Sequence, residues 1–214
     1  MGSGMLMFRF LTKALIATGL LTGGLIAFHV PSAAGSMQST VAPLGGPTSV
    51  PYGWVDFCQR YRGECEAPEL AAAEIELTPK AMKEIERVNR WVNSNITPMP
   101  DMEHWGVVDQ WDYPTDGKGD CEDYALLKRK LLIEEGLPRQ ALLMTVVKDQ
   151  NNDGHAVLTV KTNKGDFILD NMRDDVRAWT QTGYRFVKRQ SQTDPNVWVS
   201  LGDPRPAPAT AASR

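Results

Sequence analysis

The chain has 214 residues, of which 42% are hydrophobic and 23% charged, and its formal net charge is −3. No cluster of lysine and arginine stands out along it, which excludes the basic footprint of a nucleic-acid-binding protein. The size and composition suit one soluble globular domain and specify no function by themselves.

Residues 1–34 have the features of a secretory signal peptide. Arg9 and Lys13 precede an uncharged run over residues 14–28, and residues 32–34 are small, as a signal peptidase requires. The uncharged run is shorter than the roughly 20 residues that a membrane-spanning helix needs. We therefore expect export to the periplasm. An uncleaved N-terminal membrane anchor is the competing interpretation.

Composition divides the mature chain into a folded middle and two irregular ends. Residues 35–50 are rich in Ser, Gly, Pro and Thr and are predicted to form a flexible mature N-terminus. Residues 203–214 are rich in Pro and Ala and are predicted to form a disordered tail. One domain is therefore expected over residues 51–202.

The three cysteines predict one disulfide and one free thiol. Cys58 and Cys65 lie seven positions apart in a polar segment that contains a glycine, so this segment can close as a local loop. An oxidising compartment favours that bridge, which leaves Cys121 unpaired. Three reduced, buried cysteines are the alternative.

Two longer helices are predicted ahead of the strands. Thr78 and Pro79 suit the N-cap and the first helical position, and apolar residues follow at helical spacing at positions 82, 85, 88 and 92. A second helix is expected to begin near Cys121, with Asp120 as its N-cap, and to end at Gly136.

The remaining pattern predicts short strands at residues 141–147, 155–162, 167–170 and 184–188. The sequence Asn-Lys-Gly at residues 163–165 indicates a hairpin between the second and third of them. Helices followed by a mostly antiparallel sheet form an α+β pattern.

Cys121, His155 and Asp170 are candidates for nucleophilic catalysis. Cys121 opens a predicted helix, where unpaired N–H groups and the helix dipole favour the thiolate. His155 begins one predicted strand and Asp170 ends the next, so the hairpin should bring them together. A carboxylate beside an imidazole fixes its tautomer and stabilises the imidazolium. Spacing alone leaves open a structural cysteine, a surface histidine and an aspartate that merely ends a strand.

The other histidine of the mature chain, His104, is not expected to be catalytic. It lies with Trp105 and Trp111 in a loop upstream of Cys121. These aromatic residues are expected to fill the core, and lining a substrate cleft is the alternative.

Four stretches of the sequence together resemble one known family: PYGWVDFCQR, WGVVDQWDYPTDGKGDCEDYALLKRKLLIEEGLP, GHAVLTVKTNKGDFILDN and TGYRFVKRQS, with GDCEDYA as the most specific block. They resemble the bacterial transglutaminase-like cysteine proteinases, a group that includes the LapG-type periplasmic proteases that release biofilm adhesins. The resemblance implies a papain-like core, in which a central helix carries the nucleophile and packs on an antiparallel sheet that carries His and Asp. Cys121, His155 and Asp170 match these roles one by one.

The resemblance therefore implies an exported cysteine endopeptidase that acts on a protein substrate. For LapG-type members it further implies a surface adhesin as substrate and an inner-membrane receptor as regulator. The residues that form the thioester would equally serve transglutaminase-type acyl transfer to an amine. A peptidase-like module that binds a protein without turnover is the alternative from a different class.

The resemblance also implies calcium near the nucleophile. Asp120 and Glu122 flank Cys121 and Asp123 follows, and Ca²⁺ prefers such hard oxygen ligands. A bound cation would also offset the unfavourable effect of these carboxylates on the thiolate. Asp112 and Asp116 are expected to add ligands from the preceding loop. Simple capping of a helix N-terminus by acidic residues is the alternative.

Overall fold

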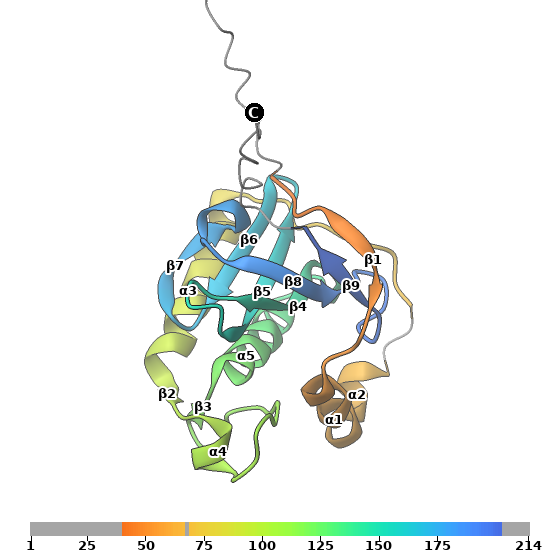
Figure 1. Ribbon diagram of the computed structural model, residues 1–214. Coiled ribbons are helices and arrows are strands. Elements are labelled where there is room, and N and C mark those ends of the chain that lie inside the picture. Colours follow the sequence, from red (N-terminus) through yellow and green to blue (C-terminus); the bar gives the residue numbers. More distant parts are fainter. Residues whose placement is uncertain (1–39, 67–68, 203–214) are drawn as a thin grey trace, which may run out of the picture. The chain divides into compact units, whose positions relative to one another are not determined.

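A computed structural model describes residues 40–66 and 69–202 of the chain (Figure 1). The predicted signal peptide over residues 1–34 and the predicted tail over residues 203–214 lie outside the described residues. Within the described part, none of the helices combines the length and the apolar character needed to cross a bilayer.

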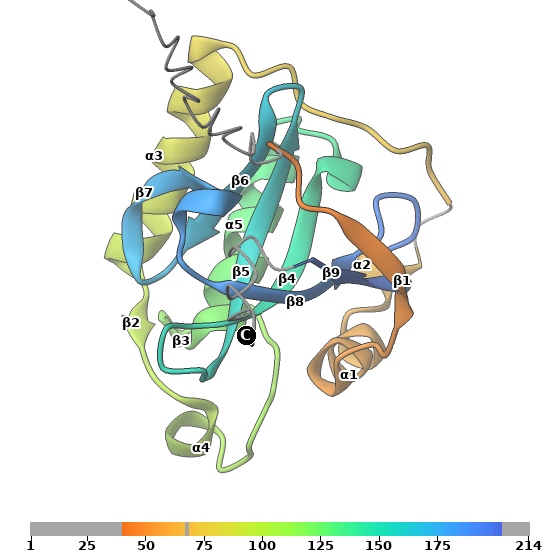
Figure 2. The same ribbon diagram turned by 45° about the horizontal axis from the view of Figure 1, so that its top comes forward.

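A seven-stranded antiparallel sheet forms the framework, in the order β1-β9-β8-β4-β5-β6-β7 (Figure 2). The long strands β4, β5 and β6 lie next to one another in it, and β5 and β6 are joined by the hairpin that the sequence predicts, with Thr162 opposite Gly165. A separate pair of two-residue strands, β2 and β3, is parallel. The strands are β1 Leu44–Thr48, β2 Thr97–Pro98, β3 Lys118–Gly119, β4 Leu142–Lys148, β5 Gly154–Thr162, β6 Gly165–Asp170, β7 Arg173–Ala178, β8 Arg185–Gln190 and β9 Trp198–Leu201.

The two long helices pack on the same side of this sheet. In Figures 1 and 2, α5 lies against β4, β5 and β6, and α3 lies against α5 and β7. This arrangement confirms the predicted α+β fold with a central helix on an antiparallel sheet. The helices are α1 Tyr52–Arg60, α2 Arg62–Cys65, α3 Pro79–Asn95, α4 Asp101–His104 and α5 Cys121–Glu134, with short 3-10 turns η1 Arg139–Ala141 and η2 Trp179–Gln181.

Alternation along β5 explains why this strand is buried on both faces. Leu158 and Val160 belong to the large core beneath α5, whereas Val157 belongs to a second core that contains Trp179 and Phe186. Successive side chains of a strand point to opposite faces, so one strand can serve two cores. The start of β5 is thereby held firmly beside the start of α5.

The predicted helix boundaries are largely confirmed. The Thr78 hydroxyl caps α3 by accepting the Ala81 N–H at 3.1 Å. Gly136 follows α5 with φ of 92°, a left-handed conformation that glycine adopts at little cost. Asp120 occupies the N-cap position of α5, but its side chain makes no capping hydrogen bond. The predicted N-cap residue is therefore confirmed, although its carboxylate oxygens are directed elsewhere.

The sequence did not predict β1, β7 or β9. Strand β1 lies within the segment 35–50 for which a flexible N-terminus was predicted, and it pairs with β9. Its sequence LGGPT has no apolar alternation, so nothing in the pattern indicates a strand. A side chain at Gly45 would collide with the Ser200 hydroxyl, so the glycine allows β1 to approach its partner closely.

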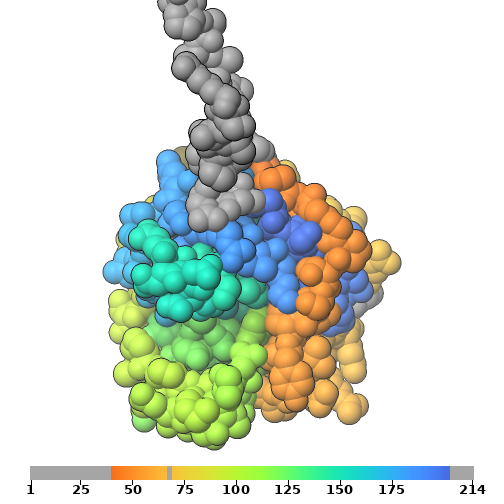
Figure 3. All heavy atoms as spheres, viewed as in Figure 1, coloured from red at the N-terminus to blue at the C-terminus, as the bar shows by residue number. Residues whose placement is uncertain are grey.

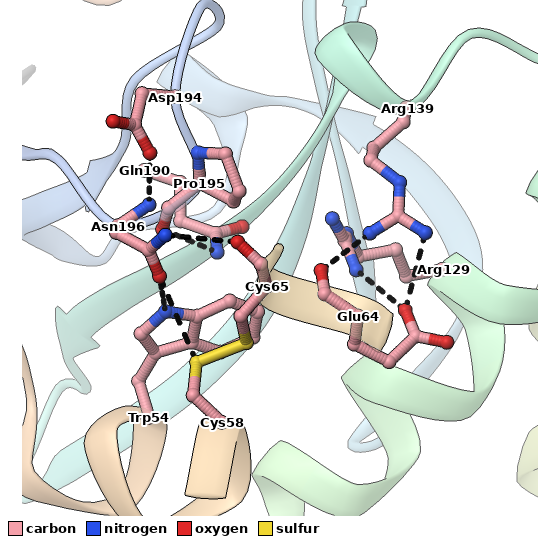
Figure 4. The surroundings of a disulfide bond; sticks show 10 residues. All are labelled: Trp54, Cys58, Glu64, Cys65, Arg129, Arg139, Gln190, Asp194, Pro195 and Asn196. Carbon is pink, nitrogen blue, oxygen red and sulfur yellow. Dashed lines mark hydrogen bonds and ion pairs between the residues drawn. A yellow bond between two sulfur atoms is a disulfide. The ribbon is translucent and has the colours of Figure 1, made fainter. Parts of the chain in front are cut away.

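The predicted disulfide between Cys58 and Cys65 is confirmed, and it joins α1 to α2 (Figure 4). Asn196, which precedes β9, accepts a hydrogen bond from Trp54 Nε1 and donates one to the Cys65 carbonyl. The disulfide and this asparagine together fix α1 to the rest of the domain. Cys121 is the free cysteine of the described residues.

Candidate active site

The thiol of Cys121 lies where the first turn of α5 meets the start of β5. Its Sγ is 3.0 Å from Glu122 Oε2, to which the thiol donates, and it accepts the Ala156 N–H at 3.4 Å. The side chain is partly exposed. Because β5 is anchored in both cores, Ala156 fixes the position of the sulfur relative to the sheet.

His155 and Asp170 form the hydrogen-bonded pair that the hairpin predicts. His155 Nε2 donates to Asp170 Oδ1 at 2.9 Å, and both side chains are buried. This bond leaves Nδ1 as the imidazole nitrogen free to face a reacting group. Burial opposes ionisation of Asp170, but the hydrogen bond and charge of His155, together with hydrogen bonds from Tyr184 and Met172, outweigh it and lower the pKa of this carboxyl below its usual value.

Tyr184 completes this pair from the residue before β8. Its hydroxyl donates to Asp170 Oδ2 at 2.5 Å, and the Met172 N–H donates to Oδ1 at 3.0 Å. The tyrosine ring also meets the His155 ring edge-on, with 5.6 Å between ring centroids. Asp170 is therefore held by three donors, which fixes the orientation of the imidazole.

An open cleft of about 480 Å³ contains both Cys121 and His155. Figure 3 shows this face of the molecule: the lime segment around α4, the orange segment of β1 and α1 and the turquoise turn between β4 and β5 surround the green start of α5. The residues that line the cleft from the loop after α4, the start of α1, the β4–β5 turn and β8 include Val108, Asp109, Trp111, Pro51, Tyr52, Gly154 and Lys188. The thiol and the histidine are thus accessible to a substrate from the same side.

Burial raises the pKa of the Cys121 thiol well above its usual range, and the charge of Glu122 and its hydrogen bond to the thiol raise it further. The Ala156 N–H acts in the opposite direction. Unless a proton or a cation neutralises them, the carboxylates beside Cys121 therefore favour its thiol form.

Five carboxylates gather at the N-terminus of α5. Oxygens of Asp101, Asp120 and Asp123 lie within 4.8 Å of one another, as do those of Asp101, Asp109 and Glu122. Burial raises the pKa of Glu122 to about 9 and that of Asp123 to about 8, and the nearby charge of Asp120 adds to both shifts. Raised pKa values mean that these two carboxyl groups hold protons near neutral pH when no cation compensates their charge.

This cluster fits a calcium ion. Asp101 Oδ1, Asp120 Oδ1 and Asp123 Oδ2 are buried, and no donor among the described residues reaches them. Oxygens on opposite sides of one Ca²⁺ lie about 4.6–5.2 Å apart, twice the usual coordination distance, which agrees with the spacing of the cluster. Gly119 also provides room, because a side chain there would collide with Asp123 Oδ2.

The structure brings three of the five predicted metal ligands together and directs the other two elsewhere. Asp120, Glu122 and Asp123 are in the cluster. Asp112 forms an ion pair with Arg60 at 2.8 Å and accepts the Tyr61 hydroxyl. Asp116 pairs with His104 Nε2 at 2.9 Å on the other side of the loop.

Three residues of the site escaped sequence reasoning. Asp101 and Asp109 lie upstream of α5, in a segment without apolar periodicity. The parallel pairing of β2 with β3 brings this segment close to the start of α5. The cluster of acidic residues from position 101 to position 123 was the available signal. Tyr184 was visible as the start of a predicted strand, but the strand order that places it beside Asp170 was not.

The aromatic residues near His104 differ in their placement. Trp111 is 4% exposed and packs edge-on against Trp54 and Trp198, so the predicted core role is confirmed, although its edge also lines the cleft. Trp105 is 46% exposed, and the prediction that it fills the core is wrong. It stacks on His104 instead, at the end of a four-residue helix too short to bury it.

Comparison with known proteins gives the following similarities. The sequence model of the family described as bacterial transglutaminase-like cysteine proteinase matches residues 44–206. The solved structure of calcium-bound LapG from Legionella pneumophila is similar at 23% identity and a TM-score of 0.49, over 60% of this chain and 74% of that chain. A second LapG structure from Legionella pneumophila is similar at 24% identity and a TM-score of 0.48, over 58% and 71%. No curated protein sequence matches the chain significantly.

Proposed function

Because the chain belongs to the bacterial transglutaminase-like cysteine proteinase family, we propose that it hydrolyses peptide bonds of a protein substrate with Cys121 as nucleophile, His155 as general base and Asp170 as the group that orients the histidine. Membership in this family makes the chain a cysteine peptidase. The observation that carries the assignment of residues is the bond from His155 to Asp170 in the same cleft as the free thiol. A nucleophile, a base that takes its proton and a carboxylate that orients the base are the three groups that acyl transfer of this kind uses.

In the proposed reaction, His155 Nδ1 takes the thiol proton as the sulfur forms a bond to the scissile carbonyl carbon. The imidazolium then gives this proton to the departing amine when the C–N bond breaks, which leaves a thioester on Cys121. Water, deprotonated by the same imidazole, attacks the thioester and releases the carboxylic acid and the thiol. Asp170 stabilises the imidazolium throughout and stays ionised, as its lowered pKa allows.

The start of α5 supplies the electrostatic part of the mechanism. The backbone N–H of Cys121 is in the first turn of the helix, where N–H groups lack helical partners. We assign it to the oxyanion of the tetrahedral intermediate, where the helix dipole adds stabilisation.

We further propose that calcium binds beside the nucleophile, held by Asp101, Asp120 and Asp123, with Glu122 and Asp109 able to join. The three unpaired buried oxygens support this role. When bound, the ion supplies positive charge that offsets the carboxylates around Cys121 and fixes the loop before α5.

The setting of this activity is proposed from the sequence. A signal peptide over residues 1–34 would deliver the enzyme to the periplasm, where Cys58 and Cys65 can oxidise. The LapG-type resemblance suggests a surface adhesin as the substrate and an inner-membrane receptor as the regulator.

The assignment is tested with Cys121→Ala and His155→Ala proteins in the presence of CaCl₂. Each should lose at least 10³-fold in turnover of a fluorogenic peptide while retaining the wild-type circular dichroism spectrum. An added primary amine that becomes coupled to the acyl group would reveal transglutaminase-type transfer. A folded Cys121→Ala enzyme with undiminished activity would exclude Cys121 as the nucleophile.

A further inference from the structure

The loop that contains α4 carries an unusual set of exposed apolar side chains. Within seven positions, Met102, Trp105, Val107 and Val108 are all exposed, and the exposed fraction of Val108 reaches 85%. Single exposed apolar residues are common on protein surfaces, but contiguous ones mark sites of interaction. Tryptophan and methionine are also enriched where proteins bind one another.

This loop is held in one conformation by its own polar groups. The Asp101 carbonyl accepts the Trp105 and Gly106 N–H groups at 2.7 and 3.1 Å, and the Asp101 carboxylate accepts the Gln110 N–H. The His104 ring stacks on Trp105 with 3.8 Å between ring centroids, and His104 is fixed in turn by Asp116. The apolar side chains are thus presented by a closed loop, so little conformational entropy is lost when they bind.

The exposed set reaches the active-site cleft through Val108. Val108 lines the cleft together with Asp109 and Trp111, and Tyr52, 77% exposed, lines it from α1. In Figure 3 the lime segment around α4 borders the cleft on the side away from the orange β1 and α1. A polypeptide that lies across Cys121 and leaves the cleft past Val108 therefore meets the loop next.

We propose that the exposed face of the α4 loop, formed by Met102, Trp105, Val107 and Val108, is a docking surface for an apolar segment of the protein substrate next to the scissile bond. The proposal rests on the peptidase function proposed above. We assign the surface to the substrate because it is continuous, through Val108, with the cleft that contains Cys121. Burial of an indole and three aliphatic side chains would supply binding energy that a short peptide across Cys121 alone cannot obtain.

The test uses a mixture of internally quenched ten-residue peptides in CaCl₂-containing buffer, followed by kcat and KM for the best-cleaved member. Trp105→Ser should raise KM roughly tenfold and Val108→Ser roughly threefold, as expected when one large or one small apolar contact is lost. The best-cleaved peptides should carry aromatic or aliphatic residues on one side of the cleaved bond. Trp91→Ser is the matched control, because Trp91 on α3 is 47% exposed, against 46% for Trp105, and lies outside the cleft.

Val108→Ser is included because a side chain so exposed contributes little to folding, so a rise in its KM cannot be attributed to a misfolded protein. Iodoacetamide labelling of Cys121 reports whether each variant keeps its nucleophile intact. A KM for both loop variants equal to that of wild type, or an equal rise in Trp91→Ser, would overturn the docking surface alone. Loss of a dimer in the loop variants, measured by gel filtration and without a change in KM, would assign the surface to a second copy of the chain. A wild-type enzyme that labels with iodoacetamide and cleaves no peptide would instead overturn the proposed function, and the docking surface with it.

Discussion

At the scale of single residues, Tyr184 helps to fix the orientation of the pair formed by His155 and Asp170. Burial and the hydrogen bond to Asp170 raise the pKa of its hydroxyl above the usual value, so the hydroxyl stays protonated and can donate throughout the neutral pH range. We expect Tyr184→Phe to keep the ring contact with His155 and to lower kcat roughly tenfold, the cost of one charge-assisted hydrogen bond, with KM unchanged. Steady-state kinetics and the imidazole NMR resonances of His155 measure both effects.

The matched control for this variant is Tyr61→Phe. The Tyr61 hydroxyl also donates to an aspartate, Asp112, but this pair makes no hydrogen bond to the residues of the proposed triad. Tyr61→Phe should therefore leave kcat and the His155 resonances unchanged. If Tyr184→Phe behaved in the same way, Tyr184 would be no more than a packing residue.

The residues of the site were only partly predictable from the sequence. Cys121, His155 and Asp170 could be found because each lies at the end of an element, and a hairpin of known register relates the last two. Tyr184 and Asp101 could not be found, because strand β8 crosses to the far side of β4 and the α4 loop returns through β2 and β3. Such long-range placement depends on packing that no local pattern encodes.

At the scale of elements, α5 carries a buried lysine whose protonation should reduce stability. Lys128 is fully buried, burial lowers its pKa to about 7, and its Nζ has no hydrogen-bond partner among the described residues. An unfolded lysine titrates near pH 10.4, so between pH 7 and about 10.4 the unfolded state binds more protons and stability rises with pH. Below pH 7 the full cost of the buried charge is present.

We therefore expect Lys128→Met to stabilise the protein by about 1–4 kcal/mol at pH 6, the range seen when buried charges are replaced by apolar side chains. The gain should shrink as the pH rises from 7 towards 10.4. Urea unfolding of both proteins at pH 6 and at pH 9.5 measures it. Lys130→Met is the control, because Lys130 is exposed on the same helix and should show no gain that depends on pH. A gain for Lys128→Met that is equal at both pH values would contradict the argument.

The elements themselves were predictable where a local period was strong. The apolar spacing of α3, the capping Thr78 and the hairpin at residues 163–165 all appear in the structure. The missed strands β1 and β9 lie towards one edge of the sheet and β7 at the other, and none of the three alternates regularly between buried and exposed residues. Their pairing with neighbours, rather than their own sequence, makes them strands.

At the scale of the whole molecule, the acidic cluster should make stability depend on both pH and calcium. The pKa values of Glu122 and Asp123 are raised to about 9 and about 8, whereas unfolded carboxyl groups titrate near 4. Between these values the folded state binds more protons, so the calcium-free protein should lose stability as the pH rises from about 4 to about 9. These two groups contribute their full stabilisation only below the pKa that they have in the unfolded state.

Calcium should reverse this trend, because it binds the deprotonated carboxylates that high pH produces. At a free concentration of 100 times its dissociation constant, a ligand adds about 2.7 kcal/mol, which corresponds to a rise in Tm of roughly 5–10 °C for a domain of this size. We expect that rise in CaCl₂ relative to EGTA at pH 8, and a much smaller one at pH 5, where protons compete for the same oxygens. Differential scanning calorimetry measures both. Asp123→Asn should abolish the effect of calcium, whereas Asp175→Asn, which changes an exposed carboxylate on β7, should not. Equal Tm values in CaCl₂ and EGTA at pH 8 would show that the five carboxylates do not bind calcium. Their unpaired oxygens and raised pKa values would then need another explanation.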